Sequence, residues 1–118
     1  MSHRRRQAER RGRIGESFAA LWLNLQGWSI VARRVRTPVG EVDLVARRGR
    51  TTLFVEVKTR ATRAELDLAI DAYRLARVAA AVEMLAPRFA RPGDTLGIDV
   101  ILLAPWSLPR RIRNAWMG

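Results

Sequence analysis

Residues 40–60 read GEVDLVARRGRTTLFVEVKTR, and this stretch determines the fold. Two strand-like runs, residues 41–47 and 51–59, flank a short turn that contains a glycine. Runs of this kind joined by such a turn are the signature of a β-hairpin. We expect the turn to centre on Gly49 and Arg50, a two-residue loop with glycine first, as in the type II′ geometry.

Three acids and one lysine interrupt the apolar pattern of this hairpin. In the register set by the turn, Asp43 lies directly opposite Glu56. Side chains alternate between the faces of a strand, so Glu41 shares a face with Asp43, and Lys58 shares a face with Glu56. Directly opposed like charges destabilise a strand pair, so a positive group is expected between the acids. Lys58 is one candidate, and a divalent cation held by oxygen ligands is the other.

The second run of the hairpin is apolar on both faces, which is typical of a strand inside a sheet. A charge on such a strand is costly unless it is paired or binds a metal. Lys58 is the one lysine among the 22 basic residues, and the other 21 are arginine. A buried lysine can lose its proton whereas arginine stays charged, so Lys58 could position or deprotonate a water. The simpler alternative is that Lys58 only pairs with Glu56 or Glu41.

The charge of the chain favours a nucleic-acid partner. Its 118 residues suffice for one core, and the formal net charge is +11. The arginine clusters suit a phosphate backbone or an anionic membrane surface, and no long one-sided basic helix of the membrane-binding kind is visible. The alternative is that the arginines only solubilise the chain. The clusters are residues 4–6, 10–13, 33–36, 47–50 and 110–113.

The composition restricts the kind of metal site. The chain has no cysteine, and its single histidine, His3, lies in the basic leading segment. Thiolate sites are therefore excluded, zinc sites and histidine-based catalysis are disfavoured, and any metal is expected to be hard and oxygen-bound. No apolar run approaches the roughly 20 residues of a membrane span, and no signal-peptide pattern follows Met1. We expect a cytoplasmic protein without a membrane partner.

A first helix is predicted over residues 13–26 from the spacing of its apolar positions. It follows a basic N-terminal extension, residues 1–12, which is expected to be frayed or to form a short helical extension over nucleic acid. Residues 13–118 are expected to form a single domain. Glu16 lies at the edge of the apolar face of this helix. It either leans into the site or forms a salt bridge with Arg13, and helical geometry favours neither.

The remaining segments predict an α/β order. A β-leaning segment precedes the hairpin, a polar loop follows it, and an alanine-rich helix ended by Pro87 leads to a last apolar strand. Because strand, helix and strand form a right-handed crossover, this strand should run parallel to the one that carries Glu56. A short edge strand is expected near the C-terminus. The segments are residues 28–35, 59–67, 68–86, 95–104 and 105–118.

Several other residues are candidates for the site or its surroundings. Arg60 and Arg63 in the polar loop suit phosphate contacts, as do Arg74 and Arg77, which share a face of the second helix. Asp99 is either a further acid of the site or the partner of an arginine, and the second role is favoured.

The tryptophans could stack on unpaired bases. Core packing is favoured, because none of them is interleaved with the arginines in a regular pattern. They are Trp22, Trp28, Trp106 and Trp116.

In this order of elements the chain resembles the core of the PD-(D/E)XK nucleases, the restriction-endonuclease-like fold. Within that group it closely resembles the small bacterial YraN family, on GEVDLVA at residues 40–46 and FVEVKTR at residues 54–60. The proline-aspartate pair that names the fold is Val42-Asp43 here. The likeness covers nearly the whole chain, since it also takes in Gly15-Glu16, Ile98-Asp99-Val100 and Asn114-Ala115-Trp116.

The resemblance implies a mixed central sheet flanked by helices and a role for each motif residue. Asp43 and Glu56 would bind Mg²⁺ or Mn²⁺, with the main-chain carbonyl of Val57 completing the shell. Lys58 would orient or deprotonate the attacking water, and Glu16 would contribute through a second metal or a bridging water. The catalytic set is Glu16, Asp43, Glu56 and Lys58, with Glu41 and Asp99 as secondary candidates.

The expected function is hydrolysis of phosphodiester bonds in DNA, with arginines that bind the backbone rather than the bases. A domain without a recognition insertion is expected to select a DNA structure, such as a branch or an end, over a sequence. The related junction-resolving nucleases also suggest a homodimer. The alternatives are a module of the same fold that binds nucleic acid without cutting it, and a basic structural protein. The acids favour the enzyme, because they would repel phosphate in a protein that only binds it.

Overall fold

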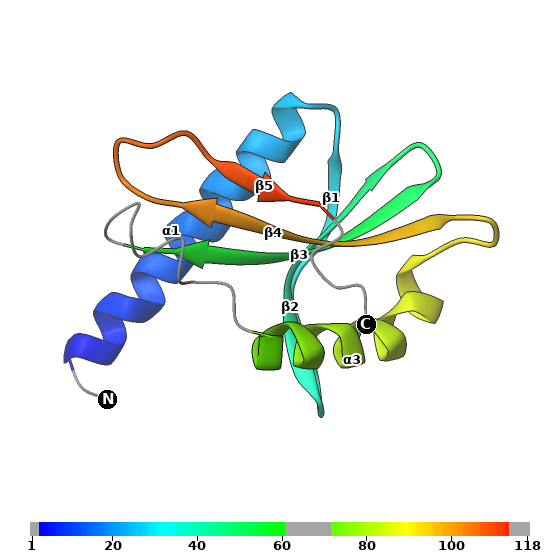
Figure 1. The fold of residues 1–118 in the computed structure, drawn as a ribbon, viewed down its shortest axis with the longest axis horizontal. Coiled ribbons are helices and arrows are strands. Elements are labelled where there is room, and N and C mark those ends of the chain that lie inside the picture. The colour runs from blue at the N-terminus through cyan, green and yellow to red at the C-terminus, as the bar shows by residue number, and fades with distance from the viewer. Residues whose placement is uncertain (1–2, 61–71, 114–118) are drawn as a thin grey trace.

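The computed structural model describes residues 3–60 and 72–113, with side chains from residues 13–60 and 75–113. The fold is α/β with the predicted order, including the parallel last strand and the short edge strand (Figure 1). The elements are α1 (His3–Leu25), β1 (Ser29–Thr37), β2 (Gly40–Arg48), β3 (Thr51–Thr59), α3 (Ala72–Phe89), β4 (Thr95–Leu103) and β5 (Arg110–Ile112).

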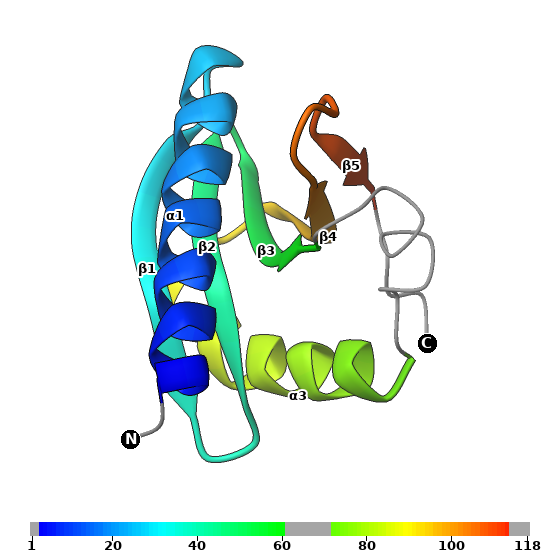
Figure 2. The ribbon, with the colours of Figure 1, turned by 90° about the vertical axis from the view of Figure 1, so that its left-hand side faces the viewer.

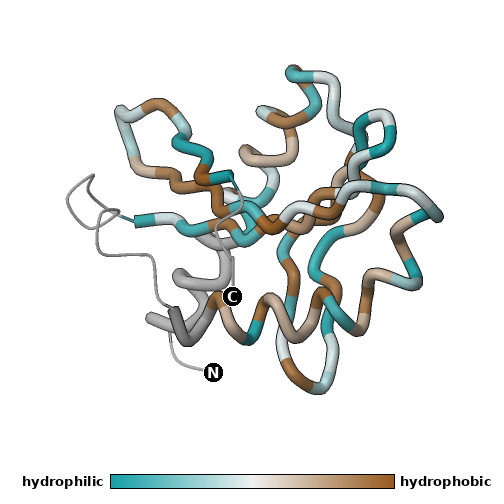
Figure 3. Tube along the Cα trace, turned by 45° about the vertical axis from the view of Figure 1, so that its right-hand side comes forward, coloured by the Kyte–Doolittle hydropathy of each residue, from teal (hydrophilic) through white to brown (hydrophobic). Residues whose placement is uncertain are grey.

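The five strands form one mixed sheet in the order β1-β2-β3-β4-β5. Three neighbouring pairs are antiparallel, and β3 and β4 are parallel. The chain therefore passes through α3 between the two central strands, as the crossover prediction required. The apolar residues of the sheet run along these strands in the middle of the molecule (Figure 3).

The turn of the β2–β3 hairpin has the predicted two-residue length. Arg48 pairs with Thr51, which leaves Gly49 and Arg50 as the loop. Gly49 has a φ of 59°, whereas Arg50 is not among the residues with positive φ. Positive φ at the first loop residue alone is the type II′ pattern, so the glycine supplies the conformation that fixes the register.

The helix bounds differ from the predicted ones. Helix α1 begins at His3 rather than at residue 13, so the basic extension is helical, one of the two states expected for it. It consists largely of good helix formers that lack an apolar period. Helix α3 continues past Pro87 to Phe89. A proline this close to the end removes only one of the last backbone hydrogen bonds, so the helix tolerates it. The predicted start at residue 68 lies outside the described residues.

The core has one layer on each face of the sheet (Figure 2). Helix α1 packs with β2, β3 and β4 in one cluster, and α3 packs on the other side in two more. The first includes Leu23, Trp28, Leu44, Val55 and Ile101, and the others include Phe54, Val78, Val82, Leu75 and Val100. Within the described ranges, no helix is both long and apolar enough to cross a membrane.

Candidate metal and nucleic-acid site

Strands β2 and β3 separate at Asp43. Their paired register ends at Leu44 and Val55, and its continuation would place Asp43 opposite Glu56, as predicted. In place of the next ladder bond, the backbone N–H of Val57 donates to Oδ2 of Asp43 at 2.7 Å. The N–H and C=O of a residue in a strand point to the same side. The Val57 carbonyl is therefore directed toward β2 as well.

Strand β2 also twists at this point. Val42 packs in the α3 cluster and Leu44 in the α1 cluster, although residues two apart in a flat strand share a face. Beyond the twist, Gly40 lies so close to α3 that a Cβ atom on it would be 2.7 Å from the Arg77 carbonyl oxygen. The separation of β2 from β3 creates a pocket beneath α3. Its lining residues are Gly40, Glu41, Asp43, Glu56, Arg77 and Val78.

Three carboxylates converge beside this pocket from α1 and β2. One oxygen each from Glu16, Glu41 and Asp43 lies within 4.8 Å of the others. The pKa of Asp43 is raised to about 7 by burial and then by the nearby charge of Glu56, against the hydrogen bond from Val57. Close acids with too little positive charge between them are the arrangement that a divalent cation relieves.

Basic side chains pair with the acids. Lys58 Nζ lies 2.8 Å from Glu56, and both side chains are almost fully buried, at 6% and 5% exposed. The two residues therefore share a face, as predicted, and form an ion pair. Arg36 lies 3.4 Å from Glu41 at the exposed rim.

Glu16 pairs with Arg34, at 2.5 Å between Nε and Oε2. Glu16 also belongs to the group of three acids, so it both reaches the site and forms a salt bridge. Its partner is Arg34 rather than the expected Arg13. Arg34 has a φ of 51° within β1, where non-glycine residues rarely adopt positive values. Sequence reasoning missed Arg34, because neither its backbone conformation nor its contact across 18 positions leaves a local pattern.

Asp99 lies apart from these acids. It is registered with Val55 of β3, whereas Glu56 is registered with Val100, so Asp99 projects from the opposite face of the sheet. There it pairs with Arg111 at 2.5 Å. This is the arginine-partner role that the sequence favoured.

The arginines proposed for phosphate binding have different positions. Arg77 is exposed and lines the pocket, with its Nε 3.4 Å from the Val39 carbonyl oxygen. Arg60 follows β3, and its backbone N–H donates to the Leu103 carbonyl. Arg63 lies outside the described residues, and the description of Arg74 is limited to its backbone in α3.

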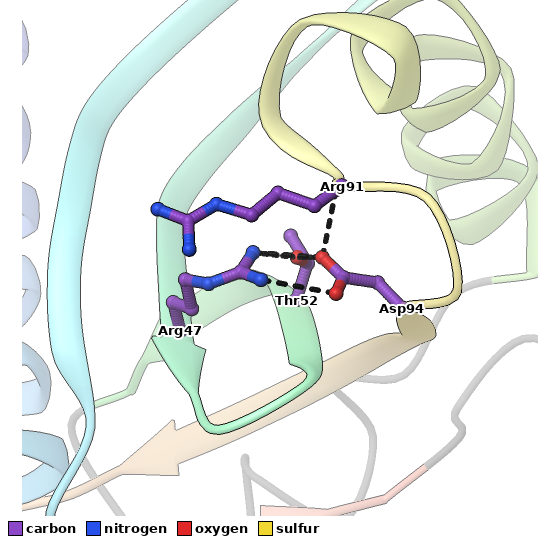
Figure 4. Close-up of polar contacts among 4 residues, drawn as sticks. All are labelled: Arg47, Thr52, Arg91 and Asp94. Atoms are coloured by element: carbon purple, nitrogen blue, oxygen red, sulfur yellow. Dashed lines mark hydrogen bonds and ion pairs between the residues drawn. The ribbon is translucent and has the colours of Figure 1, made fainter.

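The opposite end of the hairpin is closed by a polar cluster (Figure 4). Arg47 forms two hydrogen bonds to Asp94, at 2.7 and 3.0 Å, and Thr52 donates a third at 2.9 Å. The backbone N–H of Arg91 donates to the same carboxylate at 2.8 Å. These bonds, those from Arg47 first, lower the pKa of Asp94. This cluster fastens the hairpin tip to the start of β4.

The tryptophans do not share one environment. Trp28 is buried between Arg48 and Arg111, whose guanidinium carbons lie 4.3 and 5.3 Å from its ring centroid, and Trp22 is half-buried. The preference for core packing was wrong for Trp106, which is fully exposed. The short proline-bounded loop that carries it offers no core position. Trp116 lies outside the described residues.

The model of the family described as "Uncharacterised protein family UPF0102" matches residues 15–103. The chain belongs to the UPF0102 family. This confirms the resemblance to the YraN type. A UPF0102 protein of Sphingopyxis alaskensis is 66% identical over 95% of this chain and 97% of its own. Another, of Erythrobacter litoralis, is 64% identical over 96% of this chain and 97% of its own.

The UPF0102 chain is also similar to a solved structure, a Holliday junction resolvase of Archaeoglobus fulgidus, an archaeal hyperthermophile. The TM-score is 0.57 and the identity 21%, over 82% of this chain and 74% of the resolvase. This likeness establishes the fold: the sheet and helices of the UPF0102 chain are arranged as in the resolvase.

Proposed function

We propose that this UPF0102 protein is a metal-dependent nuclease that hydrolyses phosphodiester bonds in DNA. The observation that carries the proposal is the gathering of Glu16, Glu41 and Asp43 within 4.8 Å of one another. It lies next to the buried pair of Glu56 and Lys58. Acids concentrated in this way repel phosphate, although the chain as a whole has a net charge of +11. Their presence is explained if they bind a cation, because the cation can then bind a phosphate.

The side chains present fit Mg²⁺ or Mn²⁺. Hard divalent ions prefer carboxylate and carbonyl oxygens, which this site offers without any thiolate or imidazole. Asp43 and Glu56 would hold the ion with the Val57 carbonyl, and Glu16 and Glu41 would contribute from the side of α1. A bound ion supplies two functions, since it acidifies water and neutralises charge on the phosphate.

The remaining residues act on the nucleophile and on the substrate. Lys58 is held next to Glu56 inside the protein, so its ammonium is positioned to orient the attacking water and to exchange a proton with it. Arg77 at the pocket rim binds a neighbouring phosphate. Contacts to phosphates carry no base information, so the enzyme selects DNA by structure, at branches or ends. The resolvase fold supports this choice.

The proposal includes a homodimer formed through the outer face of α1. Four residues on this face are more than half exposed, at helical spacings of four, three and four: Ile14, Phe18, Leu21 and Leu25. In an antiparallel pair of helices Ile14 meets Leu25 of the second copy and Phe18 meets Leu21, so the stripe is complementary to itself.

The charges of α1 also favour a second copy over nucleic acid. The exposed positions between Arg13 and Gln26 carry no charge, as Ser17 and Asn24 flank the apolar stripe. In the antiparallel arrangement Arg13 lies beside the C-terminal end of the partner helix, where the helix dipole favours a cation. The basic first turns of the two helices then point away from each other.

The test of the nuclease is direct. Purified protein is incubated with Mg²⁺ or Mn²⁺ and labelled linear duplex, single-stranded and four-way branched DNA. Cleavage is expected, preferentially of the branched substrate, and Glu56→Gln and Lys58→Met should each reduce the rate by about 100-fold or more. Glu83→Gln, on the exposed side of α3, is the matched control and should cleave normally.

DNA binding should persist in both inactive variants. If the wild-type protein binds DNA but cuts none of the three substrates with either metal, the nuclease is ruled out. The non-catalytic binding module then remains.

A further inference from the structure

Trp106 is displayed to solvent in a constrained loop between β4 and β5. Its side chain is fully exposed, at 105%, and Leu108 is exposed at 90%. Trp106 has a φ of 61°, a left-handed conformation that bulky residues rarely adopt. Large aromatic side chains are otherwise mostly buried, so a strained and fully exposed one points to a binding role.

The loop is held in this form by its own sequence. Pro105 and Pro109 bracket it and fix their own φ angles. The N–H of Ser107 donates to the Ala104 carbonyl at 3.3 Å and closes a turn around Trp106. A stiff loop loses little conformational freedom when it binds a ligand, which favours recognition by this segment.

The loop leaves the sheet at the end of β3 and β4 that carries Lys58 of the proposed active site. Thr59 is registered with Leu103, and the N–H of Arg60 donates to the Leu103 carbonyl at 3.0 Å. Leu103, the last residue before the loop, therefore lies one residue beyond the level of Lys58. In Figure 2 the arrowhead of β3 lies at the centre, and the loop before β5 rises above it, away from α3. Trp106 is three positions beyond Leu103, so its Cα atom lies within about 11 Å of the Cα atom of Leu103, the partner of Thr59.

We propose that Trp106, supported by Leu108, is a stacking site for an unpaired nucleobase of the DNA strand that enters the active site. An indole face stacks on any base, and arginines beside it bind the phosphates of the same strand. Arg60 lies beside the start of the loop, because its N–H donates to the Leu103 carbonyl, and Arg110 follows the loop in the chain. This inference rests on the proposed function, and it names the substrate feature that the site selects, an unstacked base at a branch or end.

A continuous duplex does not offer such a base, because each base is already stacked between its neighbours. The Trp106 contact thus distinguishes branched or single-stranded DNA from a plain duplex. An anionic membrane could also accept an exposed tryptophan and leucine next to arginines. Nucleic acid is favoured because a membrane in contact with this loop would cover the ends of β3 and β4 near Lys58, where the proposed substrate would enter.

The test measures binding in EDTA, so that it is independent of cleavage. Wild-type protein, Trp106→Ala and Trp106→Phe are titrated into a labelled 12-nucleotide oligothymidylate and a 12-base-pair blunt duplex. Trp106→Ala should weaken single-strand binding about tenfold or more and duplex binding less than twofold. Trp106→Phe, which retains an aromatic face, should recover most of the affinity. Leu96→Ala, exposed at the opposite end of β4, is the control and should bind as wild type.

The outcomes separate this inference from the nuclease proposal. If Trp106→Ala binds the oligothymidylate as wild type does, the stacking site is disproved even where the enzyme cleaves DNA. An equal loss for single strand and duplex also overturns it, since it indicates a general electrostatic or folding effect. A selective loss in a protein that cuts no DNA supports the stacking site and counts against the nuclease alone.

A membrane role is tested in parallel by sedimentation with phosphatidylglycerol vesicles. If Trp106→Ala abolishes co-sedimentation and leaves oligothymidylate binding unchanged, the loop is a membrane contact and the proposal is wrong. Because Trp106 is fully exposed, the variants should melt within a few degrees of wild type. Circular dichroism verifies this before binding is compared.

Discussion

Burial changes the acidity of Asp43 strongly. Its pKa of about 7 exceeds the ordinary 3.8, so the folded protein holds this proton more tightly than the unfolded chain does. Between these pH values the folded state binds more protons, and its stability falls as the pH rises. Above about pH 7, the ionised Asp43 lowers the free energy of unfolding by up to about 4 kcal/mol.

Asp43→Asn should therefore raise the melting temperature of the metal-free protein by several degrees at pH 8 and by little at pH 4.5. The asparagine oxygen can still accept the hydrogen bond from Val57. Thermal melts in EDTA between these pH values measure the effect. A lower melting temperature for Asp43→Asn at pH 8 would show that the carboxylate is not destabilising.

Arg34 supplies the positive charge next to Glu16 in the metal-free protein. A divalent ion bound by the acids experiences repulsion from this guanidinium, so Arg34→Gln should bind Mn²⁺ about tenfold more tightly. Isothermal titration calorimetry measures the change. Arg36→Gln is the matched control in the same strand, because the exposed pair of Arg36 with Glu41 should matter little. Weaker Mn²⁺ binding by Arg34→Gln would mean that Arg34 mainly positions Glu16.

At the scale of elements, α1 must approach β3 closely to bring Glu16 to the site. A Cβ atom on Gly15 would overlap Oγ1 of Thr59, so this contact requires glycine. Gly15→Ala should destabilise the fold by about 1–3 kcal/mol and weaken metal binding by displacing Glu16. Urea denaturation measures the first effect and calorimetry with Mn²⁺ the second.

Adding Thr59→Ala should restore the stability and the metal binding of the Gly15→Ala protein, because it removes the Oγ1 atom that the new methyl group would meet. The two substitutions are then strongly non-additive in a double-mutant cycle. Additive effects would locate the strain elsewhere.

Much of this arrangement was predictable, for reasons that differ between elements. The hairpin register followed from a glycine turn and a period of two, both local, and it brought Asp43 and Glu56 to the same place. The parallel pairing of β3 with β4 followed from the right-handed crossover that a strand, a helix and a strand form. The helix ends were harder, because α1 extends over basic residues whose helix propensity has no periodic signal. Arg34 was missed and Trp106 was wrongly expected in the core, since long-range ion pairing and loop exposure depend on the assembled fold.

At the scale of the molecule, the proposed dimer predicts a specific cross-link. The chain has no cysteine, so introduced thiols are the only ones present. Ile14→Cys and Leu25→Cys proteins, mixed and oxidised, should form a disulfide between them, and neither should form one alone. Parallel helices would give the reverse result, and no cross-link in any sample would argue for a monomer. Phe18→Ser should abolish the dimer in light scattering.

The two ends of the β2–β3 hairpin differ in how firmly they are held, because only the tip is bonded to the polar cluster around Asp94. Arg47 and Thr52 bond Asp94, and the N–H of Thr95 donates to the Arg50 carbonyl at 2.8 Å, so the hairpin tip cannot move from β4. At the opposite end β2 has left β3. Local openings should therefore begin at Asp43 and stop before the tip. Amide protons near Asp43 are expected to exchange with deuterium long before those near Thr52, so the end of the hairpin at the acids should open while its tip stays closed.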